Sequence, residues 1–212
     1  MIDYSKVKGV IHIGASEGQE RFKYNSYDLN VLWIEPIPAI FQKLQNNIKP
    51  FSKQKCLNYL VCEEDKKKYS FNISSNNGES SSILELNLHK RIWPNVHYVD
   101  SVEMIGRTLS TIIEENKIDI GDYDAINIDT QGSELLILKA SVSLLSELKY
   151  VFMEVADMDS YKGCCKLNEV NEFFESIGYK QIGLNPWDTN NKIPEGNYYD
   201  ALYYNEKSLH TL

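Results

Sequence analysis

The sequence predicts an α/β fold built on a doubly wound, mostly parallel β-sheet. Apolar runs of strand length alternate with stretches of helical periodicity along most of the chain, which is typical of a parallel sheet. The first two runs also lead into residues suited to a ligand site: residues 9–13 enter a glycine turn, and residues 31–35 end on a glutamate followed by proline. The chain has 212 residues and no internal repeat, so we expect one domain over residues 1–212.

The strands are predicted from apolar or alternating runs bounded by turn residues. Residues 69–73 alternate apolar and polar side chains, as a half-exposed strand does, and residues 96–102 do the same. The last two strands flank a turn-rich segment, 185–199, so we expect them to form an antiparallel pair. The expected strands are residues 9–13, 31–35, 57–62, 69–73, 96–102, 123–129, 149–155, 180–184 and 200–204.

The helices are predicted from apolar residues at helical spacing and from their caps. After Pro38, apolar residues recur three or four positions apart as far as Ile48, and Gly178 closes an amphipathic stretch. The expected helices are residues 19–25, 40–48 and 83–90, one that starts at Thr108, one with Glu134 in its first turn, and residues 167–177.

Residues 74–107 are expected to form an insertion over the ligand-binding edge of the sheet. The segment 74–82 reads SSNNGESSS, which is a loop by composition, and the strand 96–102 can pair with the strand 69–73. We therefore expect an inserted β-arm that serves as a lid and as a platform for the substrate.

Charge and cysteine content exclude several classes of function. The chain carries 22 basic and 30 acidic residues and a net charge of −8, which argues against a nucleic-acid partner because such a protein needs a basic surface. The first residues do not form a signal peptide and no apolar run has the length of a membrane span, so we expect a cytoplasmic protein with no membrane partner. The four cysteines contain no C-x-x-C pair, and we predict no metal site.

The glycine turn and the glutamate after the second strand predict a nucleoside pocket. Glu35 lies 21 residues after Gly14, the separation of a glycine turn from a ribose-binding acid in a βαβ unit. The glycines are spaced G-x-x-x-G, and acids lie at Glu17 and Glu20, where they would repel a pyrophosphate. This pattern favours S-adenosylmethionine (SAM), which carries ribose hydroxyls and cationic groups but no phosphate. NAD and an ordinary glycine turn without a ligand are the alternatives.

Five segments in a fixed order resemble the FkbM-type methyltransferases. They are VIHIGASEGQE (10–20), WIEPIPAIFQKLQNNI (33–48), NIDTQGSELLILKAS (127–141), YVFMEV (150–155) and GNYYDALYY (196–204). The resemblance covers about residues 9–205. It implies a class I, SAM-dependent enzyme with a Rossmann-like seven-stranded sheet that methylates hydroxyl oxygens, often on sugars.

The resemblance also implies which residues bind the cofactor. The glycine turn would hold its methionine part, Glu35 its ribose, and the segment after the third strand its adenine. Asp129 would lie beside the transferred methyl group. The expected cofactor-binding residues are Gly14, Ala15, Ser16, Gly18, Glu35, Pro36, Cys62, Glu63 and Asp129.

His12 departs from the pattern of many class I enzymes, which carry at that position an acid that helps to anchor the amino group of the cofactor. Histidine cannot replace a carboxylate in this role, so Glu17 or Glu20 is expected to supply the anionic partner of the amino group instead. The alternative is that His12 is simply a satisfied strand histidine. Glu20 is our preferred cofactor-binding acid together with His12.

On the acceptor side, a hydroxyl gains reactivity from a base within hydrogen-bond reach. Asp129 is the best candidate for this base, and the other catalytic candidates are His89 and His97. The candidate substrate-binding residues are Ser81, Ser82, Arg107, Glu134 and Glu154. Four aromatic residues are candidates to stack on a sugar ring or to pack in the core: Trp93, Tyr98, Tyr161 and Trp187.

The resemblance implies an O-methyltransferase that acts on a sugar, a nucleotide sugar or a glycan. Arg107 would pair with the diphosphate of a nucleotide sugar. The alternatives are methylation of another small molecule or a peptide, and a cofactor-binding module without turnover. The sequence does not predict the oligomeric state.

Overall fold

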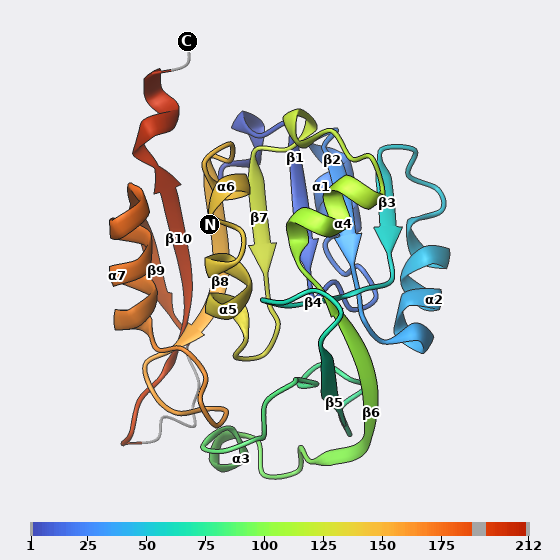
Figure 1. Cartoon of the computed structure of the whole chain (residues 1–212), viewed down its shortest axis with the longest axis vertical. Coiled ribbons are helices and arrows are strands. Elements are labelled where there is room, and N and C mark those ends of the chain that lie inside the picture. The colour runs from blue at the N-terminus through green and yellow to red at the C-terminus, as the bar shows by residue number, and fades with distance from the viewer. Residues whose placement is uncertain (1, 188–193, 211–212) are drawn as a thin grey trace.

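The computed structural model describes residues 2–187 and 194–210 (Figure 1). Its main sheet consists of β1 (Gly9–Ile13), β2 (Asn30–Ile34), β3 (Gln54–Leu57), β7 (Ala125–Ile128), β8 (Tyr150–Ala156), β9 (Tyr179–Pro186) and β10 (Tyr198–Asn205). The strand order is β3-β2-β1-β7-β8-β10-β9, and β10 alone runs antiparallel to its neighbours. The predicted α/β fold, with its seven-stranded, mostly parallel sheet and antiparallel C-terminal strand, is confirmed.

Helices cover both faces of this sheet. One face carries α1 (Arg21–Ser26) and α2 (Pro38–Ile48), and the other carries α4 (Leu109–Glu115), α5 (Glu134–Lys139), α6 (Val142–Leu145) and α7 (Leu167–Ile177). Short 3-10 helices occupy Tyr4–Lys6, Ile120–Asp122 and Glu206–His210.

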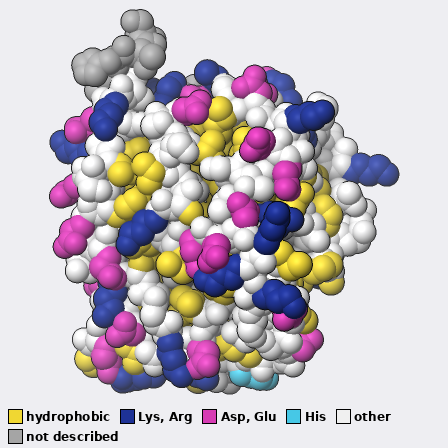
Figure 2. Space-filling view, viewed as in Figure 1, with side chains coloured by type: hydrophobic (Ala, Val, Ile, Leu, Met, Phe, Trp, Pro, Cys, Tyr) yellow, Lys and Arg dark blue, Asp and Glu magenta, His cyan; other side chains and the backbone are white. Residues whose placement is uncertain are grey.

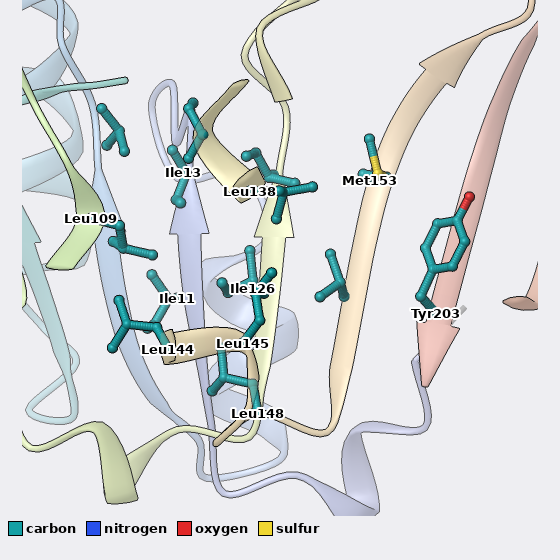
Figure 3. Packing of buried hydrophobic residues seen from close by; sticks show 14 of the residues in the cluster. Ile11, Ile13, Leu109, Ile126, Leu138, Leu144, Leu145, Leu148, Met153 and Tyr203 are labelled. Carbon is teal, nitrogen blue, oxygen red and sulfur yellow. The ribbon is translucent and has the colours of Figure 1, made fainter. Parts of the chain in front are cut away.

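The central strands are apolar at every position because both of their faces are buried. Successive side chains point to opposite faces, so Val10 packs with the cluster under α2, whereas Ile11 packs with the cluster under α4 to α7. Figure 3 shows the second cluster, in which Ile11 and Ile126 of the sheet meet Leu109 and Leu145 of the covering helices. This core holds the ends of β1, β2 and β7 in a fixed arrangement.

A smaller sheet projects from the carboxyl ends of the parallel strands (Figure 1). It consists of β4 (Leu60–Val61), β5 (Lys68–Ser74) and β6 (Tyr98–Arg107) in the order β4-β6-β5, with β5 and β6 antiparallel. The helix α3 (His89–Ile92) lies in the connection between β5 and β6. We call residues 68–107 the arm. The predicted pairing of two strands within an inserted β-arm is confirmed, although β6 extends further than the expected 96–102.

Two predicted elements are wrong. The third strand was expected at residues 57–62, but β3 ends at Leu57 and residues 60–61 belong to the small sheet. The chain leaves the main sheet at Asn58, whose amide Nδ2 donates to the carbonyl oxygens of Glu35 and Pro36 at 2.7 and 3.0 Å.

The helix expected at 83–90 is replaced by an irregular segment of bends with an isolated β-bridge, followed by α3. The backbone N–H of Asn87 donates to the carbonyl of Ser160, and that of Leu88 donates to Asp159. Non-local hydrogen bonds therefore take the donors that a helix would have used. Of the turn-rich segment 185–199, residues 188–193 lie outside the described residues.

No helix in the described part of the chain combines the length and the hydrophobicity that a membrane span requires. On the face shown in Figure 2, acidic and basic side chains are interspersed.

Candidate active site

A cavity of about 450 Å³ opens at the carboxyl ends of the parallel strands, beneath the arm. Its wall combines the turn after β1, the end of β2, the segment 59–61, the arm, the turn after β7 and Glu154 of β8. Ligands of doubly wound sheets bind at this edge, close to the point where the strand order reverses. Here that point lies between β1 and β7.

The turn after β1 is pressed against the end of β7. Gly14 has φ +80°, and a Cβ atom on it would lie 1.7 Å from the carbonyl oxygen of Asp129. The N–H groups of Gly14 and Ala15 both donate to the carbonyl oxygen of Ile34, at 3.0 and 3.1 Å. Only glycine permits this approach, which brings the candidate cofactor loop and the candidate base together.

Glu35 is buried at the end of β2 and is held by two backbone donors. Its Oε2 accepts from the N–H of Ser16 at 2.9 Å, and its Oε1 accepts from the N–H of Ile37 at 2.8 Å. Burial raises the pKa of Glu35 to about 7, against the lowering effect of these two hydrogen bonds. Each carboxyl oxygen can accept a further hydrogen bond, so a ligand with two adjacent hydroxyls fits here.

His12 is a neutral, partnered histidine in the wall of the cavity. Its ring stacks on Trp33 at 4.8 Å, its Nδ1 lies 3.2 Å from the hydroxyl of Tyr24, and Asn127 approaches both of its ring nitrogens. Burial lowers the pKa of His12 to about 4, which the nearby Glu20 only partly offsets.

The two acids predicted to anchor the amino group of the cofactor in place of residue 12 lie in different places. Glu20 lines the cavity with Oε2 at 4.0 Å from Nδ1 of His12. Glu17 forms an ion pair with Lys43 at 2.7 Å and lies outside the cavity wall. The geometry therefore favours Glu20 over Glu17.

Asp129 follows β7 and is oriented by a short chain of hydrogen bonds. Gln131 donates from Nε2 to Oδ1 of Asp129 at 2.6 Å, and the hydroxyl of Tyr161 donates to Oε1 of Gln131 at 2.5 Å. Burial, and then the charge of Glu134, raise the pKa of Asp129 to about 7. Glu154 lies in the same wall, and burial followed by the charge of Asp129 raises its pKa well above the usual value.

The arm and the stretch after β9 each contribute a tryptophan to the cavity. Trp93 and Trp187 lie in its wall with ring centroids 6.3 Å apart, in an edge-to-face arrangement. His89 packs on Trp93, and its Nε2 lies 3.2 Å from the hydroxyl of Ser80. Its Nδ1 is buried and has no partner among the described residues, and burial lowers the pKa of His89 to about 4.

The comparisons with known proteins agree with this geometry. The model of the FkbM methyltransferase domain matches residues 12–180. The chain belongs to the FkbM methyltransferase family. SAM is the cofactor of this family. No match to the chain is found among the curated proteins.

Solved structures resemble this FkbM protein in fold. The methyltransferase domain of METTL16 is 13% identical with a TM-score of 0.53, and the match covers 93% of this chain and 59% of that one. An uncharacterized protein from Listeria monocytogenes serotype 4b is 12% identical with a TM-score of 0.51, and the match covers 93% of this chain and 61% of that one. A putative tRNA (m1A22) methyltransferase from Streptococcus pneumoniae, solved in complex with SAM, is 8% identical with a TM-score of 0.49. The match covers 93% of this chain and 67% of that one. The FkbM chain thus spans about 60% of the length of the first two structures.

Most of the predicted site residues of the FkbM chain lie in the cavity wall. The members of this set are His12, Gly14, Ala15, Ser16, Glu20, Glu35, Pro36, Ser81, His89, Asp129 and Glu154. Gly18 lies outside the wall, beside Leu44 of α2. In the described part of the chain, no group of three or more His, Cys, Asp or Glu residues could hold a metal ion.

Cys62 and Glu63 lie outside the cavity wall, contrary to expectation. Because β3 ends at Leu57, the segment in the wall is 59–61, which includes β4, and Cys62 and Glu63 lie beyond the end of β4. The thiol of Cys62 packs beside Gly106, and Glu63 pairs with Lys67 at 3.0 Å.

Glu134 and Ser82 stabilise the turn after β7 instead of lining the cavity. The carboxylate of Glu134 accepts from the N–H groups of Thr130 and Gly132 at 2.8 and 3.1 Å. Ser82 is fully buried, and its hydroxyl donates to the carbonyl of Gln131 at 2.8 Å. Ser82 therefore ties the arm to the turn that carries Asp129.

Arg107 and His97 also lie outside the cavity wall. Arg107 ends β6, and its Nε lies 3.8 Å from Glu115 of α4. His97 is exposed at the start of β6, where its N–H donates to Ser75.

Gln131 is the main site residue that the sequence analysis missed. It lies within the motif around Asp129, but its φ of +56° and its contact with Tyr161 depend on packing with residues 30 positions away. Tyr161 supports the site from outside the wall through Gln131, and Tyr98 donates to the carbonyl of Leu84 away from the wall. Trp93 and Trp187 lie in the wall.

Proposed function

We propose that this FkbM-family chain transfers a methyl group from SAM to a hydroxyl oxygen of a sugar. The observation that carries the proposal is the position of Asp129. Its backbone contacts the glycine turn and its carboxyl is oriented by Gln131, in a cavity whose wall also contains Trp93 and Trp187.

The residues of the cofactor side fit SAM. Glu35 retains acceptor capacity for the two ribose hydroxyls, and Glu20 provides a carboxylate for the amino group. The segment 59–61 and Ile37 supply apolar surface of the kind an adenine ring packs against. When bound, SAM supplies an activated methyl group and leaves as S-adenosylhomocysteine (SAH).

Asp129 is the proposed general base. A base works best when its pKa lies near the operating pH, and a pKa of about 7 places Asp129 in that range. It would take the proton of the acceptor hydroxyl as the new bond from oxygen to the methyl carbon forms. Gln131 would act as a positioning residue that fixes the carboxyl plane. His89 faces the same cavity but stays neutral, which suits hydrogen bonding to the acceptor.

The two tryptophans support a sugar as the acceptor. Sugar rings present apolar C–H faces that stack on aromatic side chains, while their hydroxyls bond to carboxylates and hydroxyls nearby. Ser81 and Glu154 provide such groups in the wall. The arm, residues 68–107, would act as lid and platform within one methyltransferase domain.

Calorimetry with SAH, and NAD as the control titrant, tests the cofactor assignment. Saturable one-site binding of SAH without binding of NAD supports it, and binding of NAD alone overturns it. Transfer of radiolabelled methyl groups from SAM to a panel of sugars, alcohols, amines and peptides then tests the acceptor. Turnover confined to amines or peptides would overturn the assignment of a sugar hydroxyl.

A further inference from the structure

Polar side chains of the arm form a hydrogen-bonded cluster beside the cavity. The cluster consists of Ser74, Asn76, Ser80, Ser81 and His89, and all of these except Ser74 lie in the cavity wall. Its serines and its histidine are buried, although the segment 74–82 has the composition of a loop. The hydrogen bonds of this cluster determine which ring nitrogen of His89 carries a proton.

The amide of Asn76 has one orientation in this cluster. The backbone N–H of Ser80 donates to Oδ1 of Asn76 at 3.3 Å, and since a backbone N–H is always a donor, the amide oxygen must be the atom on this side. Nδ2 of Asn76 donates to Oγ of Ser80 at 3.0 Å. The hydroxyl proton of Ser80 is not used in that bond and needs a different acceptor.

His89 provides this acceptor. Its Nε2 lies 3.2 Å from Oγ of Ser80, and among the described residues no other acceptor lies within hydrogen-bond distance of this hydroxyl. Nε2 therefore accepts the hydrogen bond and carries no proton. Burial lowers the pKa of His89 to about 4, so near pH 7 the ring is neutral and holds one N–H. That proton lies on Nδ1, which makes Nδ1 a donor.

The Nδ1 donor of His89 is available to a ligand. It has no hydrogen-bond partner among the described residues, although His89 is 2% exposed. Buried polar groups are normally satisfied, so an unsatisfied one on a residue that lines a cavity indicates a partner supplied by the ligand. Because Nδ1 donates, the ligand atom must be an acceptor, such as a sugar oxygen.

An aromatic pair lies beside this donor. Trp93 packs on the ring of His89 with centroids 4.6 Å apart, and Trp187 meets Trp93 edge to face. Trp187 is held in place, since its Nε1 donates to Asp200 at 2.8 Å and its ring stacks on Tyr198 at 5.5 Å. Trp93 is half-buried and makes no side-chain hydrogen bond to the described residues, so its ring can shift and admit a ligand to Nδ1.

We infer that Nδ1 of His89 donates a hydrogen bond to an oxygen of the sugar acceptor, and that this bond, with stacking on Trp187, selects the hydroxyl that reaches Asp129. The inference rests on the proposed function and deepens it. The bonded oxygen is not the methylated one, because a donor on the reacting oxygen would hold the lone pair that attacks the methyl group. His89 is not a second base, because the lone pair of Nε2 is already used by Ser80.

The position of the proton is tested by NMR on the full chain, isotope-labelled in its histidine ring nitrogens. Long-range proton–nitrogen correlations distinguish the two tautomers of the ring, and the signals of His89 are those lost in the variants below. We expect the proton on Nδ1 at about pH 7. A proton on Nε2 would overturn the inference, and this measurement needs no substrate.

Two variants separate the roles of the ring nitrogens. The amide nitrogen of an asparagine side chain lies close to the position of Nδ1, and that of glutamine close to Nε2. His89→Asn should therefore keep kcat/KM for the sugar within about threefold, whereas His89→Gln should lose about tenfold or more. His97→Gln, at an exposed position outside the cavity wall, is the matched control and should change nothing. Unchanged SAH binding, measured by calorimetry, shows that each variant is folded.

Deoxy sugars locate the bonded oxygen. For a sugar that the protein methylates, each single deoxy analogue is compared as a substrate of the unmodified protein and of His89→Gln. One position other than the methylated hydroxyl should cost the unmodified protein about tenfold and the variant less than about threefold, because the partner of this oxygen is already absent there.

The outcomes separate the two proposals. Equal losses in His89→Asn and His89→Gln, or one deoxy profile shared by the unmodified protein and His89→Gln, overturn the inference and leave the sugar methyltransferase proposal standing. Methyl transfer to no sugar overturns the proposed function and, with it, the inference.

Discussion

Gln131 donates a hydrogen bond from Nε2 to Oδ1 of Asp129 at 2.6 Å, and so fixes the carboxyl group that we assign as the base. Since this hydrogen bond stabilises the ionised form, it lowers the pKa of Asp129, while burial raises it. Gln131 in turn depends on the hydroxyl of Tyr161, which is buried against the arm.

Tyr161→Phe should therefore lower kcat by about tenfold with little change in the KM for SAM, because Gln131 loses its own partner and the base is less well oriented. Gln131→Ala should also move the rise of kcat/KM with pH to higher pH, since the base loses a stabilising donor. Tyr98→Phe is the matched control, because its hydroxyl donates to the carbonyl of Leu84 outside the cavity wall. Equal losses in the Tyr98 and Tyr161 variants would contradict the positioning role.

The methyl-transfer rate should depend on the ionisation of Asp129. Its pKa is raised to about 7, and only the ionised carboxylate accepts a proton, so kcat/KM should rise as the pH increases through about 7 and then level off. Asp129→Asn should lose about 10²–10⁴-fold in kcat and retain SAH binding. The measurement is the pH profile from 5.5 to about 9, and a profile that is flat across this range would contradict the assignment.

Glu35 should contribute strongly to cofactor affinity. At about pH 8.5, above the pKa of about 7, Glu35 is ionised. Glu35→Gln is expected to weaken SAH binding at this pH by about 10–100-fold, because a hydrogen bond to a charged acceptor is worth about 1.5–3 kcal/mol. Calorimetric titration measures the change. The expectation fails if SAH binds this variant as tightly as the unmodified protein.

Glu20 and Glu17 provide a direct comparison of two nearby acids. Glu20 lines the cavity and Glu17 pairs with Lys43 outside it, so Glu20→Ala should weaken SAH binding by about tenfold and Glu17→Ala should not. If both alanine variants bind SAH normally, neither acid replaces the carboxylate that many related enzymes carry at the position of His12.

Gly14→Ala should destabilise the fold. The added Cβ atom would overlap the carbonyl oxygen of Asp129, so the cost should exceed the roughly 1 kcal/mol expected for placing alanine at positive φ. Gly163 provides a matched control, because it has φ +74° and a Cβ atom there would have no neighbour within 4 Å. Chemical denaturation measures both variants, and equal losses of stability would show that the contact with Asp129 is not tight.

The parts of the fold that the sequence predicted are those encoded locally. The strand before Gly14, the strand before Glu35 and the turn after Asp129 each carry their own apolar pattern and turn residues, and their meeting at one edge follows from parallel topology. The apolar run at 57–62 was misassigned because the side chain of Asn58 binds the backbone at Glu35, a contact that hydrophobic pattern does not reveal.

The acceptor side was harder to predict because it depends on contacts between distant segments. Trp93 and Trp187 are 94 positions apart in the sequence and meet only after the arm has folded over the sheet. Arg107 looked suited to a diphosphate, but its partner Glu115 lies in the following helix. The roles of Ser82 and Glu134 as supports of the turn after β7 likewise became clear only from their backbone partners.

The contact between Gly14 and the carbonyl of Asp129 has a consequence for how this enzyme family can diversify. The spacing between the donor loop and the base is set by two main chains in van der Waals contact, and not by side-chain rotamers that neighbouring substitutions could disturb. The aromatic and carboxylate residues around the acceptor belong to other segments, the arm, β8 and the stretch after β9. Acceptor preference can therefore change by substitution in those segments while the alignment needed for methyl transfer is conserved.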